Sequence, residues 1–246
     1  MPALMRVAIV SDIHGNRHAL EAVLRDVDRH GVRDVWCLGD IVGYGGRPSE
    51  CLALVTERTA ICLGGNHDLV VSGVLDIDQF TSDAGVAARW TRSVLTPDEL
   101  EVLANLHPKG ERSGVSLFHG SIRDPVWEYV LTADVAEAAL REQTTDLALV
   151  GHSHVQLALA LVESALEGGK AEPGQEVQLD THPRLINPGS VGQPRDRDPR
   201  AAWLLLDGEG EWARFMRTEY AIEGAQSDIR AAGLPLRLAD RLSRGL

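Results

Sequence analysis

Short aliphatic runs alternate with amphipathic segments along the first half of the chain. Residues 6–10 form a continuous apolar run of strand length, a pattern that predicts a strand buried on both faces. After Asn16, a predicted helix N-cap, apolar residues recur at the spacing of one helical face, and Gly31 ends this helix. Residues 34–38 predict a second strand. This alternation predicts an α/β protein whose sheet contains parallel strands.

The same alternation continues to the middle of the chain. A short helix is predicted from residue 48 to about residue 57, and the segment 70–106 is predicted to be mostly helical, with no candidate chemistry in it. Three further strands are predicted at residues 59–63, 115–118 and 146–150. Each of the five strands ends in polar residues.

The pattern changes after His154, where strands follow one another with few helices between them. These strands are predicted at residues 155–162, 176–180, 185–186 and 201–207, and residues 167–170 and 173–174 are predicted to form a hairpin or surface loop. We therefore expect a second sheet that packs against the first. No compositional break divides the chain, which predicts a single domain over residues 1–246 with a helical tail from about residue 222 on the outside.

Composition narrows the class of protein. The chain has 246 residues, 44% of them hydrophobic and only 4% aromatic, which is enough for an aliphatic core. Its net charge of -12 opposes broad electrostatic binding to nucleic acid or to anionic lipid. Cys37, Cys51 and Cys62 lie in apolar stretches rather than in Cys-x-x-Cys pairs, so we expect reduced thiols and a cytoplasmic protein. No apolar run predicts a signal peptide or a membrane anchor.

Candidate chemistry begins in the hexapeptide that follows the first strand, residues 11–16. Asp12 and His14 are two residues apart, so in an extended segment they project to the same side and can share a divalent cation. In isolation an Asp-x-His pair is more often a helix cap than a metal site. Polar residues at the ends of the other strands reverse that preference, because ligands bind at the carboxyl ends of strands in α/β sheets.

Seven side chains at strand ends are candidate metal ligands: Asp12, His14, Asp40, Asn66, His119, His152 and His154. This set exceeds one tetrahedral site and suits two five- or six-coordinate ions, with Asp40 as the bridging carboxylate. Without thiolates the set favours Mn²⁺, with Fe, Zn²⁺, Ni²⁺ and Co²⁺ as alternatives. Individually, Asn66 could be a turn residue, His119 a histidine bonded to backbone and Asp40 a cap.

In their order these motifs resemble those of the calcineurin-like metallophosphoesterases, over about residues 7–155. The motifs are Asp12-x-His14, Gly39-Asp40, Gly65-Asn66-His67-Asp68, His119, and Gly151-His152-Ser153-His154. The resemblance implies a four-layer αββα sandwich of two mixed β-sheets flanked by helices. It implies a dinuclear centre with Asp12, His14 and His154 on one ion, Asn66, His119 and His152 on the other, and Asp40 on both. It also implies that His67 is the general acid.

One departure from the family bears on the substrate. The protein-phosphatase branch has an Asp-Arg pair after the bridging aspartate, where this chain has Gly43-Tyr44. Without that guanidinium a phosphate dianion loses a bidentate contact, which argues against phosphoprotein phosphatase activity. Arg47, Arg123 and Arg195 are possible substitutes, although each could be a solvated surface residue. Asn66, His67 and Arg195 are the predicted substrate-binding residues.

The predicted function is therefore hydrolysis of phosphodiester bonds by in-line attack of a metal-bridging hydroxide, with His67 protonating the leaving oxygen. The loop at residues 187–195 resembles that of small bacterial and archaeal members, usually described as phosphodiesterases. The expected partner is a small phosphoester, with a nucleotide among the candidates. The alternatives are a phosphomonoesterase or protein phosphatase, and a dinucleoside polyphosphate hydrolase, because residues 11–16 resemble diadenosine tetraphosphate hydrolases. A non-enzymatic scaffold would be expected to lose His67 or several ligands, and none is lost.

Overall fold

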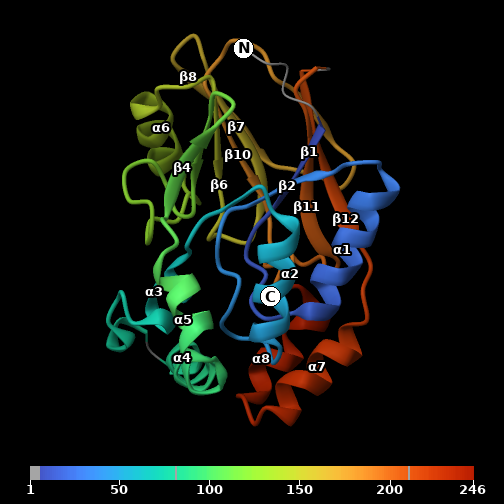
Figure 1. Cartoon of the computed structure of the whole chain (residues 1–246). Coiled ribbons are helices and arrows are strands. Elements are labelled where there is room, and N and C mark those ends of the chain that lie inside the picture. The colour runs from blue at the N-terminus through green and yellow to red at the C-terminus, as the bar shows by residue number, and fades with distance from the viewer. Residues whose placement is uncertain (1–5, 81, 210) are drawn as a thin grey trace.

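Two six-stranded mixed sheets face each other in the computed structural model, which describes residues 6–80, 82–209 and 211–246 (Figure 1). The first sheet contains, in spatial order, β3 (Ile61–Cys62), β2 (Asp34–Cys37), β1 (Arg6–Val10), β11 (Ala201–Asp207), β12 (Trp212–Thr218) and β9 (Glu176–Gln178). The second contains β4 (Lys109–Arg112), β5 (Val115–Phe118), β6 (Leu147–Val150), β10 (Arg184–Pro188), β7 (Gln156–Val162) and β8 (Ala165–Lys170). Parallel pairs join β1, β2 and β3 in one sheet and β5, β6 and β10 in the other.

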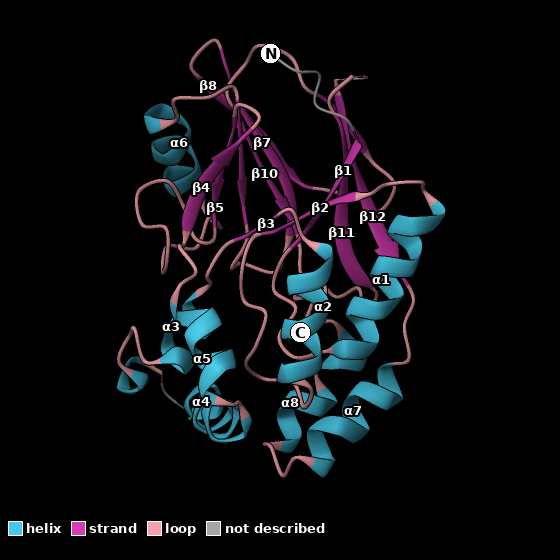
Figure 2. Cartoon of the chain, in the orientation of Figure 1, coloured by secondary structure: helices cyan, strands magenta, loops and turns pink. Residues whose placement is uncertain are grey.

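Helices form the two outer layers and a group at the lower end of the molecule (Figure 2). On the first sheet lie α1 (Arg17–Arg29) and α2 (Pro48–Arg58), and on the second lies α6 (Ala133–Glu142). The lower group contains α3 (Asn66–Ser72), α4 (Ser82–Val94), α5 (Pro97–Ala104), α7 (Ile222–Ala231) and α8 (Leu236–Asp240), and two short 3₁₀ turns span Ile77–Gln79 and Leu242–Arg244. The predicted four-layer αββα architecture is confirmed. None of the helices in the described ranges is long and apolar enough to cross a membrane.

The continuous apolar run of β1 is explained by burial on both faces. Val7 and Ile9 pack between the sheets against the partner sheet, where Leu117 and Leu149 are also buried. Ala8 and Val10 alternate to the opposite face, which α1 covers. Each large aliphatic side chain buried in this way contributes about 1.5–3 kcal/mol, so the strand ends that follow are held on a rigid base.

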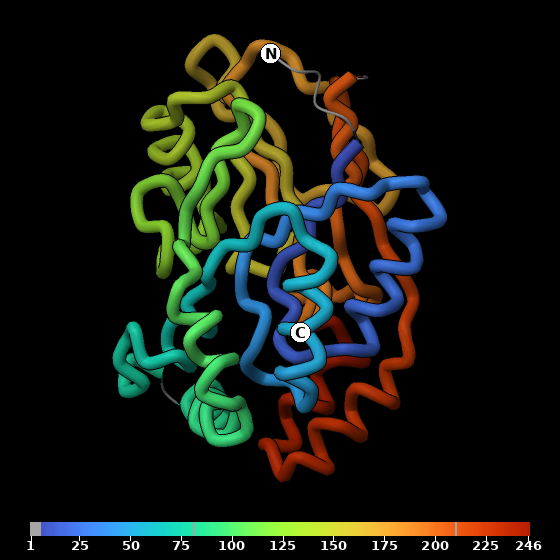
Figure 3. The backbone as a smooth tube through the Cα atoms, viewed as in Figure 1, coloured from blue at the N-terminus to red at the C-terminus, as the bar shows by residue number. Residues whose placement is uncertain are grey.

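The division of strands between the sheets differs from the prediction. We expected the strands before His154 to form one sheet and the later strands the other. Instead β5 and β6 belong to the second sheet, whereas β11 and β12 join the first, and β11 pairs antiparallel with β1 (Figure 3). The apolar pattern of a strand shows that both its faces are buried but carries no information about which strand lies beside it.

Several element boundaries also differ from the prediction. The third strand is only Ile61–Cys62, and the residues from Asn66 onward begin α3 rather than continuing a loop. Residues 167–170, predicted as a hairpin or surface loop, lie in β8, which forms a hairpin with β7. β4 and β12 were not predicted. β4 is a polar strand at the edge of its sheet, so it carries no apolar signal.

Candidate metal centre

The loops after β1 and β2 are joined by backbone hydrogen bonds that bring their polar residues together. Asp12 N–H donates to the Gly39 carbonyl (3.0 Å), and His14 N–H donates to the Asp40 carbonyl (2.9 Å). A Cβ atom on Gly65 would lie 2.0 Å from Asp40 Oδ1, so only glycine allows the loop after β3 to approach this closely. The ends of three neighbouring strands thus form one packed unit.

Five of the seven candidate ligands have a left-handed backbone conformation, which is uncommon for residues other than glycine. The φ angles are 54° at Asp12, 50° at His14, 55° at Asp40, 63° at His152 and 61° at His154. Such residues cost of order 1–3 kcal/mol each and persist only where surrounding contacts impose them. Their concentration here marks this edge of the sheets as the candidate functional site.

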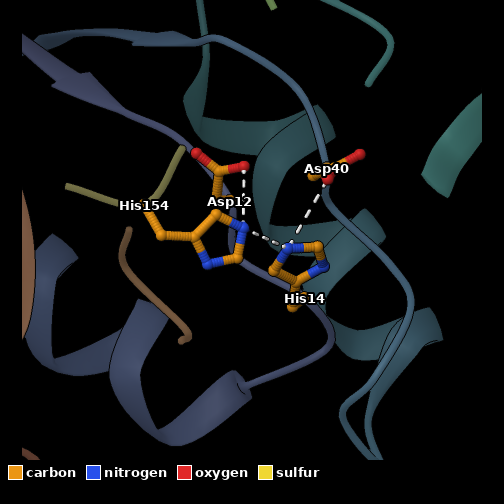
Figure 4. A group of neighbouring side chains, drawn as sticks. All are labelled: Asp12, His14, Asp40 and His154. Carbon is orange, nitrogen blue, oxygen red and sulfur yellow. Dashed lines mark hydrogen bonds and ion pairs between the residues drawn. The ribbon is translucent and has the colours of Figure 1, made fainter. Parts of the chain in front are cut away.

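The first group of converging side chains contains Asp12, His14, Asp40 and His154, all buried (Figure 4). Their ligand atoms lie within 4.8 Å of one another. The Nε2 atoms of His14 and His154 are 3.0 Å apart, and His154 Nε2 is 3.3 Å from Asp12 Oδ1. These residues come from the ends of β1, β2 and β6, so both sheets contribute to the group.

The second group contains Asp40, His119 and His152, again with ligand atoms within 4.8 Å of one another. Asn66 Oδ1 lies 3.1 Å from His119 Nε2, which places the amide beside this group. Asp40 belongs to both groups, because its Oδ2 atom is 3.5 Å from His14 Nε2 and 3.6 Å from His119 Nε2. The structure therefore brings together all seven predicted side chains, arranged around Asp40 in the two predicted sets.

Backbone carbonyls fix the orientation of three of the imidazoles. The Nδ1 atoms of His14, His119 and His154 bond to the carbonyls of Val42 (3.1 Å), Leu38 (2.9 Å) and Gln193 (2.6 Å). A carbonyl only accepts, so each Nδ1 is the protonated nitrogen and each Nε2 presents a lone pair. His119 is thus bonded to backbone through Nδ1, as one alternative for this residue predicted, while its Nε2 atom faces the other candidate ligands.

The imidazole nitrogens and carboxylate oxygens of the site face one another, and several of them have no hydrogen-bond donor beside them in the described part of the chain. Asp12 Oδ1, Asp40 Oδ2 and His152 Nε2 are buried and have no hydrogen-bond partner among the described residues. Buried polar atoms are normally paired, and acceptors facing one another repel unless a cation lies between them. This donor set, with borderline nitrogen and hard oxygen atoms, fits divalent metal ions.

Burial also shifts the protonation of the cluster. It raises the pKa of Asp12 to about 7 and raises the pKa of Asp40 well above its usual value. It lowers the pKa of His152 to about 2, and lowers the pKa of His14 and of His154 well below the usual value. These three imidazoles are therefore neutral, the form in which histidine binds metals.

His67 lies beside Asp40 at the beginning of α3. Its backbone N–H donates to Asp40 Oδ1 (2.9 Å). Asp40 therefore caps the start of this helix through Oδ1, as one alternative for this residue predicted, while its Oδ2 atom faces the other candidate ligands. The His67 ring centroid lies 4.8 Å from that of His14 and 4.4 Å from those of Tyr44 and Phe80. Burial lowers the pKa of His67. Phe80 belongs to the segment 70–106, which was predicted to contain no candidate chemistry. Its contact with the His67 ring shows that this segment does contribute to the site.

Sequence reasoning missed several residues that support the ligands. Asn187 Nδ2 donates to the Gly151 carbonyl (2.6 Å) and to Ser153 Oγ (3.0 Å), and Ser190 Oγ donates to the Asp12 carbonyl (2.7 Å). The sequence marks the loop at residues 187–195 only by its resemblance to that of small bacterial and archaeal members, and contacts distant in sequence are needed to identify these two side chains. Asp68 belongs to the Gly65-Asn66-His67-Asp68 motif but has no predicted role, and its carboxylate accepts from Gly65 N–H and Val42 N–H.

Of the three candidate arginines, only Arg195 stands at the site without a carboxylate partner in the described ranges. Arg47 pairs with Asp228, and Arg123 pairs with Glu128, so both have the surface role considered for them. Arg195 donates to Gln193 Oε1 (2.9 Å), and its Nε atom is buried and unpaired. Its charge contributes to the lowered pKa values of His14, His67 and His154.

The chain belongs to the calcineurin-like phosphoesterase superfamily, whose domain model matches residues 5–210. This metallophosphoesterase class comprises hydrolases that act on phosphoric esters. The structure is similar to that of a metallophosphoesterase from Sphaerobacter thermophilus, with 40% identity and a TM-score of 0.88 over 98% of this chain and 99% of that one. An uncharacterized protein of Methanocaldococcus jannaschii is 35% identical over 97% of this chain and 98% of its own length.

A more distant relative has a named activity. The symmetrical bis(5′-nucleosyl)-tetraphosphatase of Actinobacillus pleuropneumoniae is 31% identical over 148 residues. The match covers 56% of this chain and 53% of that protein, so it spans about half of each.

Proposed function

We propose that this protein is a dinuclear metal-dependent phosphodiesterase that hydrolyses small phosphoesters, nucleotides among them. The observation that carries the proposal is the placement of Asp40 Oδ2, buried and unpaired between the Nε2 atoms of His14 and His119. A carboxylate oxygen shared by two sets of imidazoles is suited to bridge two divalent ions.

In this proposal Asp12, His14 and His154 hold one ion, Asn66, His119 and His152 hold the other, and Asp40 holds both. Bound at these residues, the two ions would lower the pKa of a water molecule, orient it for in-line attack at phosphorus and offset the charge of the phosphoryl oxygens. Mn²⁺ is the proposed metal, with Fe, Zn²⁺, Ni²⁺ and Co²⁺ as alternatives, because oxygen and imidazole ligands without thiolates suit these ions.

His67 is the proposed general acid. It is adjacent in sequence to Asn66, and its backbone N–H is bonded to Asp40, so its imidazole is held next to the ligands. Burial favours the neutral ring, but an anionic phosphoester brought beside it would raise the pKa of His67 again, because opposite charge stabilises the imidazolium. The proton would then pass from the imidazole to the leaving oxygen.

Arg195 and Asn66 are proposed to bind the phosphoryl group together with His67. A diester monoanion needs less positive charge around its oxygens than a monoester dianion does. Arg195 offers a guanidinium that has no carboxylate partner among the described residues, and Gly43-Tyr44 replaces the Asp-Arg pair of the protein-phosphatase branch. The presence of Arg195 without the Asp-Arg pair supports a preference for diesters over monoesters.

A second candidate is hydrolysis of dinucleoside polyphosphates. It is favoured by the similarity to the tetraphosphatase of Actinobacillus pleuropneumoniae. Residues 11–16, which contain Asp12 and His14, also resemble diadenosine tetraphosphate hydrolases. The free thiols of Cys37, Cys51 and Cys62 support a reducing compartment such as the cytoplasm as the place of action.

The proposal is tested by rates on bis-p-nitrophenyl phosphate and p-nitrophenyl phosphate, with metal-free protein and with added Mn²⁺. A panel of 2′,3′-cyclic nucleotides, dinucleoside polyphosphates and a phosphopeptide then separates the candidates. We expect metal-dependent hydrolysis of the diester at least as fast as that of the monoester. A monoester preference of about tenfold or more would contradict the diester assignment, and equal rates with and without metal would contradict the dinuclear one.

A further inference from the structure

We propose that Tyr44 is a positioning residue that holds both His67 and Arg195 toward the substrate phosphate. It would thereby provide by packing what the Asp-Arg pair of the protein-phosphatase branch provides through hydrogen bonds and charge. The proposal rests on the phosphoesterase function proposed above. It concerns residues that bind no metal in that scheme.

No hydrogen bond from the described residues orients the imidazole of His67 at Nδ1. Its Nδ1 atom is buried and has no partner among the described residues. A Cβ atom on Gly43 would lie 2.4 Å from this nitrogen, so the ring occupies the space that a side chain at position 43 would need. A carboxylate at this position is therefore incompatible with the observed place of His67, and contacts with neighbouring rings must fix its orientation.

Tyr44 supplies the central ring of those contacts. Its centroid lies 4.4 Å from that of His67 at an interplanar angle of 52°, and 4.8 Å from that of His14 at 63°. These are distances at which tilted and edge-on aromatic pairs attract each other. Tyr44 therefore touches the proposed acid and a proposed metal ligand at once.

The backbone conformation of Tyr44 is what directs its ring into the site. Its φ angle is 58°, and Gly45 N–H donates to the Gly43 carbonyl (2.6 Å), which closes a three-residue γ-turn around it. This turn with positive φ is rare and strained, and a bulky residue in it is an outlier. A second hydrogen bond, from Gly45 N–H to the His14 carbonyl (2.9 Å), ties the turn to the loop after β1.

The same ring also contacts Arg195 and the C-terminal helices. The Arg195 guanidinium carbon lies 5.9 Å from the Tyr44 centroid, within the range of a cation–π interaction. Tyr44 also packs against a buried apolar cluster that includes Ile229, Leu238 and Leu242. Arg195 also bonds to the side chains of Gln193 and Tyr129, so the Tyr44 ring is one of three side-chain contacts among the described residues that hold the charge over the site.

These contacts predict that the ring of Tyr44 matters more than its hydroxyl. Tyr44→Phe keeps both ring contacts and is expected to stay within about twofold of the wild-type rate, whereas Tyr44→Leu removes them. In Tyr44→Leu we expect turnover of an alkyl diester to fall about tenfold and metal content to remain unchanged. Leu238→Ala is the matched control, because it weakens the same apolar cluster without touching His67 or Arg195.

A double-mutant cycle separates positioning from general destabilisation. If Tyr44 acts through His67, adding Tyr44→Leu to His67→Ala should cost less than about twofold further in kcat on the alkyl diester, measured at saturating substrate so that weaker binding through Arg195 does not limit the rate. A full tenfold further loss, or an equal loss in Leu238→Ala, would overturn the proposal. Wild-type turnover in Tyr44→Leu would overturn it as well.

Calorimetric binding of inorganic phosphate to the Mn²⁺-loaded protein tests the contact with Arg195 without relying on turnover. We expect Tyr44→Leu and Arg195→Ala each to weaken phosphate binding about tenfold, and the double variant to be little worse than Arg195→Ala. Additive losses, or unchanged affinity in Tyr44→Leu, would contradict the positioning of Arg195. Absence of both phosphate binding and turnover in the wild type would instead refute the proposed function.

Discussion

The backbone N–H of His67 donates a 2.9 Å hydrogen bond to Asp40 Oδ1, and the other oxygen of the same carboxylate lies among the histidines with no hydrogen-bond partner in the described part of the chain. The two oxygens of Asp40 thus have different surroundings. One ties the loop after β2 to the beginning of α3, and the other faces both groups of candidate ligands. This relationship couples the position of the proposed acid to the proposed bridging ligand.

Asp40→Asn should be the most damaging change among the ligands. An amide can still accept the hydrogen bond from His67 through its oxygen, but its NH₂ group then replaces the oxygen that faces the imidazoles. We expect the purified wild type to contain two divalent ions per chain and the variant to lose most of both, as measured by elemental analysis. Asp228→Asn, which alters a carboxylate paired with Arg47 and His18, should keep both ions. Full metal content in Asp40→Asn would remove this residue from the bridge.

Metal affinity should fall as the pH is lowered below about 7. The pKa of Asp12 in the metal-free protein is about 7, raised by burial, so the carboxyl is mostly protonated at about pH 6 and a metal must displace its proton. The imidazoles of His14, His152 and His154, with lowered pKa values, have no such proton to lose. The pKa of Asp40 is raised as well, so calorimetry in two buffers of different ionisation enthalpy should show proton release on metal binding that is larger at about pH 6, where Asp12 also carries a proton, than at about pH 8. Equal release at both would contradict this assignment.

His67→Ala should cost far more on an alkyl diester than on a nitrophenyl diester. A nitrophenolate leaves readily without a proton, whereas an alkoxide needs one in the transition state, so we expect a loss on the order of 10² or more on the alkyl substrate alone. Both metal ions should remain. His18→Ala is the control, because this histidine pairs with Asp228 and belongs to neither ligand group. Similar losses on both substrates would make His67 a phosphate ligand instead.

Arg195→Ala should reduce kcat/KM more for monoesters than for diesters. A hydrogen bond to a charged group is worth about 1.5–3 kcal/mol, so we expect a loss of roughly tenfold to a hundredfold on the dianion. Arg123→Ala, which removes a guanidinium already paired with Glu128, should leave both rates near the wild-type values. An equal effect of the two substitutions would show that Arg195 does not contact the phosphate.

Asn187→Ala should destabilise the protein and loosen the site together. The variant removes the amide that bonds to Ser153 Oγ, to the Gly151 carbonyl and to Gly189 N–H, and although Ser153 N–H still donates to that carbonyl, we expect a cost of about 1–3 kcal/mol in the free energy of unfolding. Because the same loop bonds His154 Nδ1 through Gln193, metal affinity should fall as well. Denaturant unfolding of the metal-free protein and titration with Mn²⁺ measure the two effects separately. Unchanged stability would show that other groups or water replace this amide.

Much of the fold could be predicted because local sequence determines local structure. The apolar run of β1, the Asn16 cap and the buried stripe of α1 appear in the structure as expected, since each depends on neighbours within one or two turns of chain. Strand partners could not be predicted in this way. The pairing of β1 with β11 joins segments almost 200 residues apart, and any buried strand would have shown the same apolar pattern.

For the site, the sequence by itself determined which side chains gather at the strand ends, because loops at the carboxyl ends of parallel strands must lie at one edge. Only the tertiary structure decided that both sheets supply them and that Asp40 Oδ2 faces both groups. It alone also placed Arg195 and Tyr44 beside His67, while Arg47 and Arg123 pair with carboxylates elsewhere. These distinctions depend on distances across loops far apart in the chain, which residue type and spacing do not encode.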